Sequence, residues 1–216
     1  MNLVADAIMS RRSVREGFSR TAIPRDVLED IVRCGLAAPS SKNARPWRFH
    51  VVTNSSLLKE LADMVERADC IDSYVPSDPA TGAPRAGFSS SVMESAAALR
   101  NAPVAVFIEN TGEFSSGRET LLAATSEALA GSIVGYTLEV IGVGAAVENM
   151  WLAAVGHGVA GVFMGDILVA ERAIRQRLEI NCDLIGVLVL GYIERSADHR
   201  VRHRIEVCKE KVRWFY

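Results

Sequence analysis

Two short runs near the N-terminus hold the residues of this 216-residue chain that are best suited to chemistry. The first is Arg11-Arg12-Ser13-Val14-Arg15, in which three guanidiniums and a hydroxyl fall within five residues. Arginine suits a phosphate, because its planar fork of donors matches two phosphate oxygens at once. The second run, residues 38–47, reads APSSKNARPW and combines hydroxyl, amide and charged donors. Together the two runs favour a donor-rich site for an anion.

The arginine run also has a simpler interpretation. Basic residues favour the C-terminal end of a helix because they complement its dipole, and a helical apolar pattern over residues 3–9 precedes the run. A second basic stretch, near the C-terminus, supports either a phosphate site or a solvated basic tail. Its members lie within 19 positions and are Arg195, Arg200, Arg202, Arg204, Lys209, Lys211 and Arg213.

Composition limits the class of protein. The chain is 49% hydrophobic, which supplies enough material for a core. Its 24 basic and 26 acidic residues give a net charge of -2, so no global basic field favours nucleic acid. We predict one domain over residues 1–216, with a lid or excursion at about 70–130. The N-terminus lacks the pattern of a signal peptide, and no uncharged apolar run reaches about 18 residues, so we expect a cytoplasmic protein without a membrane partner.

The periodicity of apolar residues predicts the elements that position the two runs. A polar stretch rich in Pro and Gly, residues 72–91, predicts a long loop or lid. Strands separated by helices indicate an α/β or α+β sheet covered by helices. Helices are expected at 3–9, from Pro24 to before Pro39, from a Ser55 cap to Val65, and at 92–100, 118–131, 134–156 and around 171–178. Strands are expected at 47–53, 103–108, 159–164 and 184–192.

Other patterns are weaker. Gly142-Val143-Gly144 begins like a dinucleotide-binding turn, but Val147 stands where that motif needs its third glycine, so we interpret these small residues as a close helix–helix contact. His199 and His203 share a spacing with metal ligands, yet arginines flank them and no cysteines have zinc-binding spacing. We expect no metal site.

The two lead runs occur together in the FMN-dependent nitroreductase family, which this chain resembles. Chains of that family open with a helix, an R-[RH]-S-x-[RK] turn, and a second helix that ends in A-P-S-x-x-N-x-Q-P-W. Arg45 stands here in place of the usual Gln. Residues 145–154, AAVENMWLAA, and residues 161–166, GVFMGD, are similar to the family's central helix and the strand that follows it. The resemblance covers roughly residues 3–55 and, more loosely, 140–216.

This resemblance implies an α+β fold with a central mixed, mainly antiparallel sheet covered by helices, in an intertwined homodimer with FMN at the subunit interface. It implies that NAD(P)H passes a hydride through FMN to a nitroaromatic compound, quinone or similar acceptor, in ping-pong order. Because the flavin supplies the chemistry, no catalytic side chain is assigned. The cofactor-binding residues implied are Arg11, Arg12, Ser13 and Arg15, the tail residues Arg202 and Arg204, the backbone at Met164 and Gly165, and Pro39, Ser40, Ser41 and Asn43 of the partner chain.

Three alternatives stay open. Another flavin reaction on the same fold, such as reductive dehalogenation or flavin fragmentation, would use every motif quoted above. A non-catalytic flavin-binding protein would share them as well. A nucleotide- or anion-binding module without flavin is the third. The segment at 70–130, which matches no motif of the family, is expected to decide between the flavin reactions.

Overall fold

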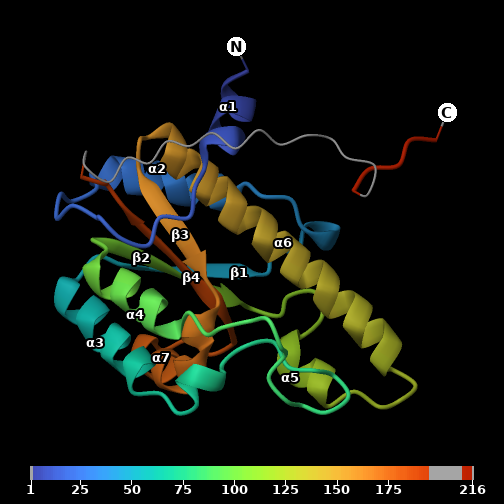
Figure 1. Ribbon diagram of the computed structural model, residues 1–216. Coiled ribbons are helices and arrows are strands. Elements are labelled where there is room, and N and C mark those ends of the chain that lie inside the picture. Colours follow the sequence, from blue (N-terminus) through green and yellow to red (C-terminus); the bar gives the residue numbers. More distant parts are fainter. Residues whose placement is uncertain (1, 195–210, 216) are drawn as a thin grey trace.

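The computed structural model of the chain describes residues 2–194 and 211–215. Figure 1 shows helices packed on both faces of a small central sheet. The helices are α1 (Leu3–Ser10), α2 (Arg25–Leu36), α3 (Ser55–Glu66), α4 (Val92–Asn101), α5 (Gly117–Leu122), α6 (Leu129–Gly156) and α7 (Glu171–Leu178). The strands are β1 (Trp47–Val52), β2 (Val104–Asn110), β3 (Ala160–Met164) and β4 (Asp183–Gly191). Short 3-10 turns complete the described part: η1 (Ser41–Asn43), η2 (Ile71–Ser73) and η3 (Asp166–Ala170).

The four strands form one sheet in the order β1-β2-β4-β3, and each neighbouring pair is antiparallel. All residues of β2 are buried, as its continuous apolar run predicts for a central strand. An isolated parallel bridge joins Ser13 to Gly161 on β3, at the edge of the sheet. This arrangement confirms the expected α+β fold with a mainly antiparallel sheet.

Helices α2 and α6 lie on one face of the sheet, and α3, α4 and α7 lie on the other (Figure 1). Gly35 on α2 allows α2 to pack closely against α6 and β1. A Cβ at Gly35 would lie 2.6 Å from Cγ of Met150 on α6 and 3.2 Å from the Phe49 ring on β1. The close helix–helix contact therefore occurs at Gly35. The expectation that Gly142 and Gly144 make it is wrong, because Gly142 faces Ser40 of a loop and Gly144 faces open space.

The longest helix, α6, spans 28 residues, and its strongly apolar sequence predicts a buried helix. That expectation holds for one face only. Its N-terminal half exposes apolar side chains, namely Leu129, Ile133, Val134, Leu138 and Ile141. By length and composition alone α6 is apolar enough to cross a membrane, a test that core helices also pass. Glu139, which is 1% exposed, interrupts this apolar stretch with a buried carboxylate.

Glu139 anchors α6 to the segment that follows β2. Its carboxylate accepts hydrogen bonds from the backbone N–H groups of Phe114 and Ser115, both at 2.8 Å, from the Ser115 hydroxyl, and from Nδ2 of Asn110 at 3.1 Å. Burial alone would raise the pKa of Glu139, but these donors outweigh burial and hold it below its usual value. A buried charge that accepts four hydrogen bonds holds α6 against the segment after β2.

Two predicted helix boundaries are wrong. Instead of a helix over 118–131, the short α5 ends at Leu122 and a turn precedes α6. The turn before α6 begins at Thr125, whose hydroxyl and carbonyl oxygens both accept from Ala128 N–H, at 3.4 and 3.1 Å, and α6 itself begins at Leu129. At α3 the cap is Asn54 rather than Ser55, since Oδ1 of Asn54 accepts from the N–H groups of Ser56 and Leu57.

Candidate functional site

The arginine turn, residues 11–15, lies beside β3. Helix α1 ends when Arg11 takes a ψ of 133°, and Val14 N–H then donates to the carbonyl oxygen of Gly161 at 2.9 Å. Neighbouring side chains in an extended segment point to opposite sides. Val14 accordingly packs against the core, while Ser13 and Arg15 are exposed. The turn thus presents a hydroxyl and a guanidinium on one side.

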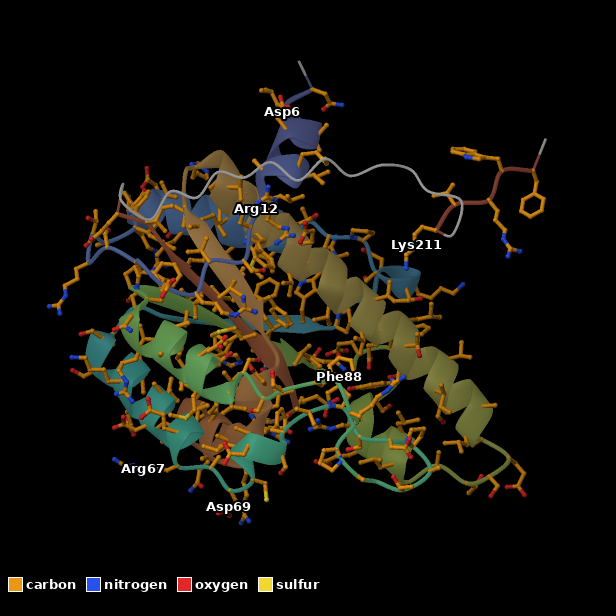
Figure 2. The ribbon with its side chains drawn as sticks, viewed as in Figure 1. Asp6, Arg12, Arg67, Asp69, Phe88 and Lys211 are labelled. Carbon is orange, nitrogen blue, oxygen red and sulfur yellow. The ribbon has the colours of Figure 1, made fainter. Side chains whose placement is uncertain are left out.

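The first two arginines of the turn are more enclosed. The guanidinium of Arg11 stacks on Trp151 of α6, 4.4 Å from the ring centroid, and its Nε lies 3.8 Å from Oε1 of Glu148. Arg12 is half-buried, and its Nη1 donates to the Arg11 carbonyl at 3.2 Å. Figure 2 shows Arg12 immediately beyond α1, at the end of the molecule where α6 finishes. The turn is therefore fixed to both β3 and α6.

The second run forms the loop 39–46, which is held largely by its own hydrogen bonds. The Ser40 hydroxyl oxygen accepts from Arg45 N–H at 2.9 Å, and Nε of Arg45 donates to Oδ1 of Asn43 at 3.1 Å. Lys42, Asn43 and Arg45 have φ values of 51°, 57° and 50°, a left-handed backbone that residues other than glycine seldom adopt. Pro39 and Asn43 are exposed, and Ser40 and Ser41 are half-buried.

Helix α6 supports both motifs, at different turns. The loop 39–46 rests on Gly142, where a Cβ would lie 3.2 Å from Cβ of Ser40. The arginine turn contacts Glu148 and Trp151. At 1.5 Å of rise per residue, Gly142 and Trp151 are about 13 Å apart along the helix axis. Asn149 fixes the end of α2 between them, since its Nδ2 donates to the Cys34 carbonyl at 3.2 Å.

Met164 and Gly165 lie at the far end of the strand that the arginine turn contacts. Met164 is buried, and a Cβ on Gly165 would meet nothing within 4 Å. The four steps from Gly161 to Gly165, which directly follows the edge strand β3, span about 13 Å. The structure therefore places the arginine turn and Met164–Gly165 along one edge of the sheet.

The loop over residues 72–91 is tied to this same end of β3. Its last residue, Ser91, donates from its hydroxyl to Oδ2 of Asp166 at 2.6 Å. At its other end, burial and the charges of Asp166 and Glu171 raise the pKa of Tyr74. Sequence reasoning missed Ser91 and Asp166, because nothing in the sequence relates residues 75 positions apart. It also missed Glu148 and Trp151, which it quoted only as part of a matching stretch.

A second polar cluster joins β1, the edge strand opposite to β3, to its neighbour β2. Glu109, fully buried, accepts from Nε2 of His50 at 2.8 Å, from the Cys182 N–H at 3.1 Å and from Arg48 at 3.4 Å. Burial raises the pKa of Glu109, but His50 and the other donors outweigh it, so the pKa lies below its usual value. The carboxylate of this cluster is satisfied by groups of the protein itself.

The remaining predicted site residues, Arg202 and Arg204, lie outside the described residues. Within the part of the chain that the structure describes, no three His, Cys, Asp or Glu side chains gather as metal ligands.

A mainly antiparallel sheet between two helical layers, with a donor-rich turn along its edge strand, is the arrangement expected for the family that the sequence resembles. The chain belongs to the Nitroreductase family, whose model matches residues 8–192. A segment of 64 residues is 39% identical to iodotyrosine deiodinase from Haliscomenobacter hydrossis. That segment covers 30% of this chain and 28% of the relative, so the chain matches less than a third of that protein's length.

Solved structures with the same fold cover nearly the whole chain. A nitroreductase with bound FMN from Desulfitobacterium hafniense superposes with a TM-score of 0.66 at 19% identity, over 100% of both chains. The NADPH:FMN oxidoreductase from Vibrio harveyi in complex with NAD+ has a TM-score of 0.64 at 19% identity, over 97% of this chain and 75% of that one. At such identities these likenesses establish the fold.

Proposed function

We propose that this protein is an FMN-dependent oxidoreductase, which carries a hydride from NAD(P)H through FMN to an electron-poor small molecule such as a nitroaromatic compound or a quinone. The observation that carries the proposal is the arginine turn, with Ser13 and Arg15 exposed together beside β3 and within the matched range 8–192. The FMN bound by the Desulfitobacterium hafniense nitroreductase, a protein of the same fold, supports the choice of cofactor.

The residues of the turn fit FMN chemically. A phosphate dianion needs cationic donors, and Arg11, Arg12 and Arg15 are three within five positions. The ribityl chain needs a hydroxyl partner, which Ser13 provides. An elongated cofactor would lie along β3 toward Gly165, where the lack of a side chain lets a flat ring approach the backbone. When bound, FMN supplies hydride acceptance and donation, so the protein's task is to bind and orient.

The full set of proposed cofactor contacts comes from two chains. One chain supplies the arginine turn, the backbone at Met164 and Gly165, and the tail residues Arg202 and Arg204. The partner supplies the loop 39–46 through Pro39, Ser40, Ser41 and Asn43. This division between two chains is the one that the resemblance to the Nitroreductase family implies.

A homodimer is part of the proposal, and the exposed apolar surfaces support it. Beyond the exposed face of α6, the first helix exposes Leu3, Val4, Ile8 and Met9. Helix α1 contacts α6, and its C-cap Arg11 packs at Glu148 and Trp151, so the exposed apolar side chains of α1 and those of α6 lie toward opposite ends of the long helix. Exposed apolar side chains gathered on the surface of a helix in this way mark an interface between proteins. A second copy of the chain is the proposed occupant, and a cytoplasmic location is proposed with it.

The direct test is the visible spectrum and kinetics of the purified protein. We expect a yellow protein whose flavin is released as FMN on denaturation. With NADH or NADPH and menadione, double-reciprocal plots should be parallel, because donor and acceptor occupy the same flavin face in turn. Treatment with a chelator should leave the rate unchanged. A colourless protein that gains no flavin absorbance when FMN is added would reject the proposal.

Reductive dehalogenation is the second candidate, and the similarity to an iodotyrosine deiodinase favours it. In that reaction two electrons from NAD(P)H, passed through FMN, and one proton would convert a carbon–halogen bond to a carbon–hydrogen bond, with halide released. Comparing halogenated phenols with nitroaromatics and quinones as acceptors, with halide release measured directly, separates the two candidates.

Replacing Arg15 by Ala tests the phosphate and flavin contacts. Hydrogen bonds to charged groups contribute roughly 1.5 to 3 kcal/mol each, so FMN affinity should fall about ten- to hundredfold. The same loss is expected for Arg202→Ala. Affinity is measured by the fluorescence of FMN released on dilution. Unchanged affinity in both variants would remove the phosphate assignment.

Mixing two variants tests whether the site is shared between chains. Arg15→Ala should damage a site through its own chain, and Asn43→Ala should damage it through the partner. In a mixed dimer both lesions fall in one site and the other site is intact. Random refolding of a mixture makes about half of the dimers mixed, which should restore about a quarter of the wild-type rate. If both motifs serve a flavin within one chain, mixing restores nothing.

A further inference from the structure

Helix α6 contacts the guanidinium of Arg11 on two sides. The flat face lies on the Trp151 ring, 4.4 Å from its centroid. The closest ionic contact is between Nε of Arg11 and Oε1 of Glu148 at 3.8 Å, too long for a hydrogen bond but within range of charge attraction. Trp151 is only 7% exposed, so its ring is a fixed surface. Together the two contacts set the plane and the direction of the guanidinium.

These contacts leave a defined edge of Arg11 for a ligand. A guanidinium presents Nε on one side and the Nη1–Nη2 pair at its end, and that pair matches two phosphate oxygens at once. Glu148 lies on the Nε side, and Trp151 covers one face. We propose that Glu148 and Trp151 are positioning residues, which hold Arg11 so that its Nη edge faces the FMN phosphate. The inference rests on the proposed function of the chain.

The sign of the effect distinguishes positioning from simple electrostatics. Glu148 is an acid close to a site proposed for a phosphate dianion, so its charge alone opposes binding. If Glu148 acted only through its field, or competed with the phosphate for Arg11, its removal would strengthen FMN binding. If Glu148 orients Arg11, its removal weakens FMN binding in spite of the lost repulsion.

The experiment measures the FMN dissociation constant of the holoprotein from the fluorescence released on dilution, a readout independent of turnover. Exposed ion pairs contribute about 0.2–1 kcal/mol, so Glu148→Gln should weaken FMN binding about 1.5- to 5-fold. Glu148→Asp keeps the charge and should recover part of that loss. Glu16→Gln is the matched control, because Glu16 is an exposed acid of the same segment, next to Arg15. It should leave the affinity unchanged or slightly higher.

Combining substitutions identifies the residue through which Glu148 acts. In an Arg11→Ala background, Glu148→Gln should no longer weaken FMN binding, since nothing remains to be oriented. Trp151→Phe keeps an aromatic face for Arg11 and should bind FMN within about twofold of wild type, whereas Trp151→Leu should bind it less tightly. The melting temperature of each variant, measured alongside, separates loss of orientation from loss of fold.

Some results would contradict only the positioning role, and another would contradict the proposed function as well. Stronger or unchanged FMN binding in Glu148→Gln, or a loss that persists in full without Arg11, would overturn the positioning role and leave the proposed function intact. A wild-type protein that binds no FMN would overturn both.

Discussion

The arginine turn and the loop 39–46 present similar groups to a ligand but are held in different ways. The arginine turn depends on distant residues: Gly161 accepts its backbone N–H, and Trp151 and Glu148 hold Arg11. The loop 39–46 depends mainly on itself, through the bond between the Ser40 hydroxyl and Arg45 N–H and the bond between Arg45 and Asn43. The arginine turn is therefore positioned by contacts with the rest of the fold, whereas the loop 39–46 is shaped mainly by hydrogen bonds within itself.

This difference predicts how each motif responds to substitution. Left-handed backbone at a residue other than glycine costs about 1–2 kcal/mol, and the loop 39–46 has it at Lys42, Asn43 and Arg45. Its internal hydrogen bonds and its seat on Gly142 offset that strain. Remote changes should therefore disturb the arginine turn strongly and the loop weakly.

The largest effect is expected for Gly161→Ala. A Cβ at this position would run into the carbonyl oxygen of Val189 and lie 2.9 Å from Cδ2 of Leu190, so β3 must move away from β4. Overpacking of this kind costs roughly 3 kcal/mol at the upper end of its usual range. The carbonyl that accepts from Val14 would move as well, so FMN affinity should fall together with unfolding stability in denaturant titrations.

Gly165→Ala, directly after the same strand, is the matched control for stability. A Cβ at Gly165 would meet nothing within 4 Å, and its φ of -97° suits any residue, so stability should stay within about 0.5 kcal/mol of wild type. If the flavin ring lies against Gly165, the added methyl group should still lower FMN affinity. Unchanged FMN affinity in Gly165→Ala would contradict the proposed place of the ring.

The next largest effect concerns α6, which supports both motifs. Glu139→Gln keeps the shape of the side chain but removes the charge that four hydrogen bonds stabilise, and should lower unfolding stability by about 2 kcal/mol near neutral pH. Because folding depresses the pKa of Glu139 below its ordinary 4.5, this stabilisation is present above pH 4.5 and is lost as pH falls through the folded-state pKa.

The measurement is unfolding by denaturant for wild type and Glu139→Gln across that pH range. The difference between the two proteins should be constant above about pH 5 and should shrink at lower pH. A difference independent of pH would mean that the carboxylate charge is not what holds α6.

The contrast between the motifs also explains what could be predicted from the sequence. Local signals succeeded for the elements: the apolar run of β2 and the helix expected between Pro24 and Pro39 were both predicted correctly. The helix expected at 118–131 is wrong because a turn from Thr125 to Ala128 interrupts it, and the hydrogen bonds of that turn leave no periodic signal in the sequence. Contacts between distant residues, such as Ser91 with Asp166 and Arg11 with Trp151, leave no local pattern.

A smaller effect is expected where α6 meets the loop 39–46. In Gly142→Ala the new Cβ would lie 3.2 Å from Cβ of Ser40 and 3.6 Å from the Pro39 carbonyl oxygen, so the loop must shift by a few tenths of an ångström. Alanine favours the helix by nearly 1 kcal/mol, which offsets the crowding, so stability should change by less than about 1 kcal/mol. Gly144→Ala gains the same helical preference without a contact and is the control. A shared site predicts that only Gly142→Ala weakens FMN binding.

The smallest effect is expected at Arg45, where the family usually has Gln. Arg45 contributes to the loop through its backbone N–H, which any residue other than proline retains, and through the bond from its Nε to Asn43 at 3.1 Å. A glutamine amide can donate to the same Asn43 oxygen, so Arg45→Gln should bind FMN within about twofold of wild type. Arg45→Pro would remove the N–H that Ser40 accepts and impose a negative φ where the backbone has 50°, so it should disrupt the loop. If Arg45→Gln instead weakened FMN binding tenfold, the Arg45 charge itself would contact the cofactor, and the loop 39–46 would not act through its internal bonds alone.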